Sequence, residues 1–147
     1  MGKLTPQQYS RWLRRFGDEI DRQAMLALDA VGTLAERYAA ANASGRVLNR
    51  RSGRLAASVR ARVSNDGGRP TLTLSSDAPY ARIHEYGGTI QGNPLLTFQT
   101  PSGVWVSAKQ VTIPRRPWVR PAIEEAVQTM PREFTRRVLA AAQFRGL

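Results

Sequence analysis

The fold of the middle of the chain is decided at residues 79–90, Pro-Tyr-Ala-Arg-Ile-His-Glu-Tyr-Gly-Gly-Thr-Ile. Tyr80 and Ile83 lie three residues apart and Tyr86 continues the spacing, so one short helical turn can press apolar groups inward. Gly87 and Gly88 then end the turn, because glycine adopts backbone conformations that residues with a Cβ atom disfavour. We expect both glycines to be required for folding or assembly.

A second stretch answers the first at residues 113–123, Ile-Pro-Arg-Arg-Pro-Trp-Val-Arg-Pro-Ala-Ile. Its three prolines fix φ and remove backbone donors, which predicts a stiff, extended approach to a helix. Trp118 lies on that approach, and Pro121 suits the first turn of the helix that follows.

Helices are predicted at both ends of the chain. Thr5-Pro6 is a good helix start, and an apolar stripe with helical period then continues to Tyr38. We favour two helices that meet at Gly17, with one bent helix as the alternative. The C-terminal helix is predicted from about Pro121 to residue 143, with a kink at Pro131 rather than an end.

The segment between the helices reads as two β-hairpins. Residues 59–63 and 72–74 alternate between apolar and polar side chains around Asn65-Asp66-Gly67-Gly68. The second hairpin turns at Thr100-Pro101-Ser102-Gly103, and we expect it to be exposed and to project, with Trp105 on the face opposite the valines. The fold class is therefore α+β: long N-terminal amphipathic helices, an antiparallel sheet of about four strands with a projecting hairpin, and a C-terminal helix.

The length of 147 residues predicts a single domain, residues 1–147. Within it, residues 1–41 are expected to be helical, 55–113 mostly β, and 118–143 helical. The chain begins with neither a signal peptide nor a run of about 20 apolar residues. We therefore expect it in the cytoplasm, without a membrane partner.

Charge is the strongest signal in the composition. The chain has 22 basic and 11 acidic residues, a net charge of +11, and nearly all of the basic residues are arginines. The ends are basic and the middle is neutral. A GC-rich genome would give the same arginine bias without any function. The densest positive patch lies on the predicted loop 42–53 and continues onto the exposed face of the first strand: Arg46, Arg50, Arg51, Arg54, Arg60 and Arg62.

The sequence contains few residues that could form a catalytic or metal-binding site. It has no cysteine and a single histidine, His84, which has no second ligand nearby and is not part of a zinc-binding pattern. The adjacent carboxylates Asp18-Glu19 and Glu124-Glu125 do not face each other on a helix. We therefore expect no catalytic residue, no cofactor and no metal, and we interpret His84 as a packed or interface residue.

Three pieces together carry a family resemblance. Ser52-Gly53-Arg54-Leu55-Ala56-Ala57-Ser58-Val59 precedes the two stretches quoted above, and the order of the three resembles the tail-completion and virion-morphogenesis proteins of tailed bacteriophages, of Mu-like or related siphophage type. The resemblance implies a structural virion protein of the phage neck, which joins head to tail as a ring around the DNA channel. Its implied partners are other copies of itself, adjacent neck, connector or tail-tube proteins, and, non-specifically, the packaged DNA.

Ring interfaces favour tryptophan, tyrosine and arginine anchors, and the candidates here are Tyr86, Trp105, Arg116 and Trp118. The arginine patch could face DNA or an acidic neighbour. We favour the neighbour, because tight phosphate binding would hinder DNA exit.

Two other function classes stay open. One is a basic nucleic-acid-binding protein without enzymatic activity. The other is a membrane-active N-terminal helix, because Trp12 and Phe16 lie among Arg11, Arg14 and Arg15.

Overall fold

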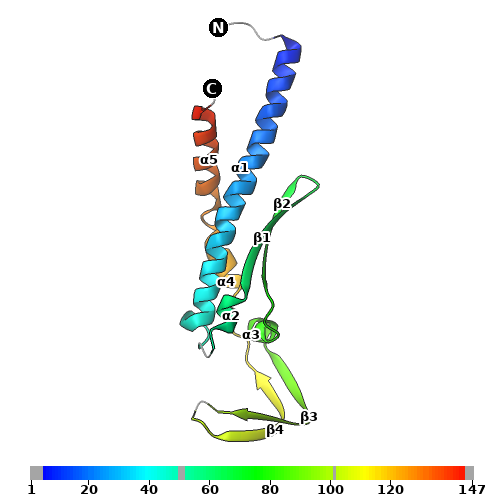
Figure 1. Cartoon of the computed structure of the whole chain (residues 1–147), viewed down its shortest axis with the longest axis vertical. Helices are drawn as coiled ribbons and strands as arrows, with labels where there is room; N and C mark the ends of the chain where they lie inside the picture. The colour runs from blue at the N-terminus through cyan, green and yellow to red at the C-terminus, as the bar shows by residue number, and fades with distance from the viewer. Residues whose placement is uncertain (1–4, 50–51, 101, 145–147) are drawn as a thin grey trace. The chain divides into compact units, whose positions relative to one another are not determined.

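A computed structural model describes residues 5–49, 52–100 and 102–144 of the chain and confirms the α+β class (Figure 1). The chain forms two compact units. The first comprises Met1–Tyr38, Arg60–Ser75 and Ala122–Leu147, and the second Ala39–Val59 and Ser76–Pro121. Each unit is described by itself below, and the single-domain assignment stays a prediction.

The first unit is built on one long helix, α1 (Pro6–Ala41), whose last residues belong to the second unit. Thr5 and Gln8 bond reciprocally at its start: the Thr5 amide donates to Gln8 Oε1 at 2.8 Å, and the Gln8 amide donates to Thr5 Oγ1 at 3.3 Å. The break that we favoured at Gly17 is wrong, because the helix passes through it. A glycine inside a helix lowers its stability by at most about 1 kcal/mol, and burial of the continuous apolar stripe offsets that loss.

A β-hairpin packs on α1 within this unit. Strands β1 (Val59–Asp66) and β2 (Arg69–Ser76) meet at Gly67 and Gly68, which have φ of +60° and +80° as a tight hairpin turn requires. Leu72 and Leu74 lie against the core residues Val31 and Ala35 of α1. The outward positions are exposed, so the predicted alternation is confirmed.

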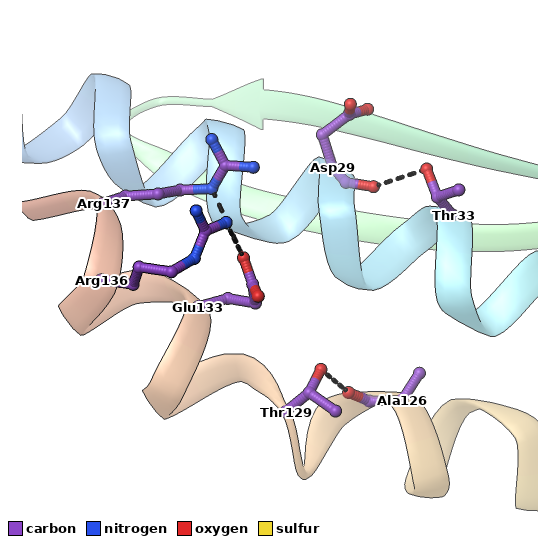
Figure 2. Close-up of polar contacts among 7 residues, drawn as sticks. All are labelled: Asp29, Thr33, Ala126, Thr129, Glu133, Arg136 and Arg137. Atoms are coloured by element: carbon purple, nitrogen blue, oxygen red, sulfur yellow. Dashed lines mark hydrogen bonds and ion pairs between the residues drawn. The ribbon is translucent and has the colours of Figure 1, made fainter. Parts of the chain in front are cut away.

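The C-terminal part of the first unit consists of two helices instead of one kinked helix. They are α4 (Arg120–Val127) and α5 (Met130–Phe144). Pro131 has no amide for the carbonyl of Val127, and its ring excludes that carbonyl, so the helix stops at the preceding turn. There the amide and hydroxyl of Thr129 both donate to the carbonyl of Ala126, at 3.0 and 2.7 Å (Figure 2).

The second unit begins where α1 ends. A wide turn, η1 (Asn42–Arg46), leads to α2 (Arg54–Ala57), and α3 (Ala81–Tyr86) then precedes a second hairpin. This hairpin consists of β3 (Gly88–Gln99) and β4 (Trp105–Ile113), which pair antiparallel from Gly88–Ile113 to Gln99–Trp105. It is longer than the sequence predicted. The four predicted strands thus form two separate two-stranded sheets.

Two glycines of α1 give a matched test of this packing. No atom lies within 4 Å of a Cβ added at Gly17, whereas a Cβ at Gly32 would lie 2.9 Å from Leu72 Cδ1 and 3.4 Å from Ala61 Cβ. We expect Gly17→Ala to stabilise the protein by about 0.5–1 kcal/mol. Gly32→Leu should destabilise it by about 1–3 kcal/mol through overpacking against the hairpin. Thermal unfolding followed by circular dichroism measures both, and a lower Tm for Gly17→Ala would contradict a continuous helix.

Candidate functional site

The two stretches that opened the sequence analysis meet at Glu85. Its side chain is buried, and its carboxylate accepts three backbone hydrogen bonds: from Trp118 at 2.7 Å, Val119 at 2.9 Å and Arg120 at 3.2 Å. These amides form the start of α4, where the first turn of a helix leaves its donors unpaired. A negative charge is also favoured at the positive end of the helix dipole. Glu85 therefore fixes the start of α4 onto α3.

Trp118 completes the junction from the inside. It is fully buried, its indole Nε1 donates to the Ala81 carbonyl at 3.3 Å, and its own carbonyl accepts a bond from Asn42 Nδ2 at 2.8 Å. Asn42 is itself buried at the end of α1. Our expectation of Trp118 as an interface anchor is corrected here, because its side chain has no exposed surface in a single copy of the chain.

Gly87 is required where α3 ends. Its φ is +72°, and an added Cβ would lie 2.9 Å from the Arg115 amide nitrogen and 3.1 Å from the Ile113 carbonyl oxygen. Both neighbours are backbone atoms, which cannot swing away. Gly88 has φ of +154°, but a Cβ added there would meet only the Ile83 side chain, at 3.6 Å. At Gly87 the backbone of the second stretch therefore lies too close to leave room for a side chain.

His84 and Arg116 line a cavity of about 530 Å³ beside this junction, together with Tyr80. The Arg116 amide donates to the His84 carbonyl at 2.9 Å, and the imidazole packs edge-on against Tyr80 at 6.1 Å between ring centroids. Burial lowers the pKa of His84 below its usual 6.5, and the charge of Arg116 lowers it further. The imidazole is therefore neutral at pH 7.

The second hairpin exposes both of its faces. No residue of β3 or β4 is buried, and Trp105 is 68% exposed at the start of β4. The register shifts between Gln91 and Leu96, where β3 bulges. The polar pairs Thr89–Thr112 and Gln91–Gln110 are consequently followed on the same face by apolar pairs, Leu96–Ala108 and Phe98–Val106. Trp105 lies on the opposite face from Val106, as expected, while Pro101 in the predicted turn lies outside the described residues.

The remaining predicted site residues divide between the two units. Tyr86 and Arg116 are exposed in the second unit, as are Arg46 and Arg54. Arg60 and Arg62 are exposed on β1 in the first unit. Arg50 and Arg51 lie outside the described residues. The roles of all of these residues at interfaces stay predictions.

Sequence reasoning missed the two polar residues that hold the junction together. It assigned no role to Glu85, and it placed Asn42 only in the predicted loop 42–53. Two signals were available in the sequence. Glu85 lies two residues before the Gly87-Gly88 pair that ends the predicted turn, and the helix predicted after it has no Ser, Thr, Asn or Asp at residues 117–119 to cap its start. Such a helix start needs an acceptor from elsewhere in the chain.

The described residues contain no group of three or more histidine, aspartate or glutamate side chains placed to hold a metal ion. In the same parts of the chain, none of the helices combines the length and apolar character needed to cross a membrane. What the fold does present is an α+β framework, locked by backbone-to-carboxylate bonds, that exposes a long two-stranded hairpin. The class of protein is therefore an α+β fold with an exposed hairpin.

Comparison with known families gives the particular assignment. The model of the phage virion morphogenesis family matches residues 14–140, which include both stretches of the junction. The chain belongs to this family. No curated protein and no solved structure matches the chain.

Glu85→Gln tests the junction. The amide keeps the size of the carboxylate but replaces one acceptor oxygen with a donor, which faces backbone amides that are donors themselves. We expect a loss of about 3 kcal/mol in the free energy of unfolding, since buried donors are left unpaired. Urea unfolding measures it, with Glu125→Gln on the exposed side of α4 as the control. Equal stability of the two variants would contradict the capping role.

Gly87→Ala and Gly103→Ala separate close approach from backbone conformation. Both glycines have positive φ, at +72° and +85°, but a Cβ at Gly103 would meet only Gln99 Nε2, at 3.9 Å. Both variants should lose about 1 kcal/mol from the strained φ. Gly87→Ala should lose about 1–3 kcal/mol more, because the backbone of Arg115 must move. If urea unfolding shows the same loss of stability for both variants, the close contact with the Arg115 backbone does not contribute.

Proposed function

We propose that this protein acts at the phage neck, where it joins head to tail as a homo-oligomeric ring around the DNA channel. The family supplies the role in virion morphogenesis. The observation that carries the proposal is the second hairpin, which is exposed on both faces in a single copy of the chain.

An isolated two-stranded hairpin is marginally stable in water. This one also exposes large apolar side chains, at residues Ile90, Leu95, Phe98, Val104, Trp105 and Val106. Exposed apolar surface of this extent marks an interaction site. The hairpin is therefore the element whose stability gains most from a neighbouring subunit.

Charge favours a second copy as the neighbour of the hairpin. The chain carries a net charge of +11, yet Lys109 is the only charged residue between positions 88 and 113. Copies of a strongly basic chain repel one another, so self-association is least costly through an uncharged surface. A face on one copy that receives a different face of the next gives a heterologous contact, and such contacts close into rings.

The arginines serve a different neighbour in this proposal. Arg46, Arg54, Arg60 and Arg62 are exposed, and with Arg50 and Arg51 they would orient an acidic surface of an adjacent neck or tail protein. Charged contacts of this kind raise the association rate and select the partner. The alternative function, non-specific DNA binding, uses the same arginines but has a steep salt dependence.

Removal of the hairpin tests the ring. A chain lacking residues 95–108 should stay folded, because none of the described residues in this range is buried, and should sediment as a monomer. The double variant Trp105→Ser/Phe98→Ser should show the same loss of assembly with the backbone intact. In infected cells that carry either variant, electron microscopy should find separate heads and tails. Wild-type assembly and virion numbers in the double variant would refute the proposal.

The arginines supply the second arm of this experiment. Arg50→Glu/Arg51→Glu should leave the mass of the oligomer unchanged while heads and tails fail to join. If joining proceeds and only salt-sensitive DNA binding is lost, the DNA-binding alternative is correct.

A further inference from the structure

A second apolar surface lies in the first unit, where α5 runs alongside the N-terminal half of α1 in the opposite direction (Figure 1). Trp12, Phe16 and Ile20 of α1 and Val138, Ala141 and Ala142 of α5 line a groove of about 210 Å³. Tyr9, Trp12 and Phe16 stack along α1, with successive ring centroids 6.0 and 5.5 Å apart. The groove is smaller than a typical small-molecule pocket and suits one or two apolar side chains.

Guanidinium groups border this groove. Arg15 lines it directly, and an adjoining hollow that shares Glu19, Gln23 and Ala141 adds Arg22, Arg136 and Arg137. Two carboxylates pair with these cations: Glu19 with Arg22 at 2.8 Å, and Glu133 with Arg136 at 2.7 Å. Arg137 reaches Glu133 only at 3.8 Å, and its buried Nε has no hydrogen-bond partner among the described residues (Figure 2). The border is therefore net positive.

We propose that this groove docks an amphipathic helix of a partner protein, with apolar residues on one face and Asp or Glu residues along its flanks. The apolar face would fill the space between Trp12 and the alanines of α5, as helices do in hydrophobic grooves. The flanking carboxylates would meet the guanidinium groups of Arg15, Arg22 and Arg136, whose planar donors match carboxylates. Trp12 is the expected anchor, because tryptophans dominate the energetics of such contacts.

The observations favour this occupant over two others. A second copy would bring the arginines of its own α1 and α5 against this positive border. A membrane would be met by a convex apolar face, whereas Trp12 and Phe16 are partly covered beside α5 and keep 37% and 42% of their surface exposed. The inference does not depend on ring assembly, which the proposal above places on the second hairpin in the other unit.

The probe is a fluorescein-labelled helical peptide of about 15 residues, with leucines at positions i, i+3, i+4 and i+7 and glutamates on the flanks. Its matched control has lysines in place of the glutamates. Fluorescence anisotropy with the full-length protein should show saturable binding of the acidic peptide and at least about 10-fold weaker binding of the basic one. Trp12→Ala should weaken binding of the acidic peptide about 10-fold or more.

Two further variants keep the result interpretable. Arg15 is exposed, and Arg15→Glu leaves the aromatic stack in place. This variant should therefore weaken binding of the acidic peptide without changing the Tm of the protein. Trp105→Ala removes an exposed tryptophan of the second hairpin and should leave peptide affinity unchanged. Its effect on oligomer mass tests the ring proposal separately.

Three outcomes would overturn the inference. Equal affinity for the acidic and basic peptides would show that charge selects nothing. Binding to phosphatidylserine vesicles that Trp12→Ala abolishes, without peptide binding, would assign the groove to a membrane. A lower oligomer mass for Trp12→Ala, again without peptide binding, would assign it to a second copy of the chain.

Discussion

The carboxylate of Glu85 is the constraint on which the second unit depends. Three backbone donors at the start of α4 converge on one buried side chain of α3. Without that acceptor, the amides of Trp118, Val119 and Arg120 would each lose this hydrogen bond. The prolines of residues 114–121 make the arrangement possible, because a stiff approach brings these amides to the carboxylate with little entropy left to lose.

This junction accounts for the position of the hairpin. Gly87 ends α3 and immediately begins the path into β3, while Ile113 and Arg115 carry β4 back past the same glycine. Both strands of the hairpin are therefore anchored at one end by packed backbone and left exposed at the other. A hairpin held in this way can present an apolar tip without the tip contributing to the fold of its own unit.

The sequence predicted most of the elements, since their signals are local. The Gly67-Gly68 turn, the alternation along β1 and the start of α1 at Thr5 all depend on neighbouring residues. The two helix boundaries that were predicted wrongly, at Gly17 and Pro131, depend on the balance between opposing contributions to helix stability. At Gly17 the apolar stripe outweighed the glycine, whereas at Pro131 the lost hydrogen bond outweighed an equally continuous stripe.

Local sequence patterns could not predict which side chains make tertiary contacts, as the two tryptophans show. Trp105 and Trp118 both sit in extended segments with mixed neighbours, so pattern alone assigned both of them to an interface. The structure places one at full burial and the other at 68% exposure. What distinguishes Trp118 is two hydrogen-bond partners far away in sequence: the Ala81 carbonyl accepts from its indole, and the Asn42 amide donates to its carbonyl.

The bulge in β3 shows how one local irregularity shapes the recognition surface. Without the extra residues between Gln91 and Leu96, each face of the hairpin would carry either the even-numbered or the odd-numbered residues of β3 along its whole length. The bulge changes that parity in β3 alone, so the face that carries Thr89 and Gln110 near the junction carries Phe98 and Val106 near the tip. On this face polar side chains therefore lie near the junction and apolar ones near the tip, whereas the opposite face carries Ile90 and Val111 near the junction and Thr97 and Ser107 nearer the tip. The bulge thus divides the apolar side chains of β3 between the two faces, with Ile90 on one and Leu96 and Phe98 on the other.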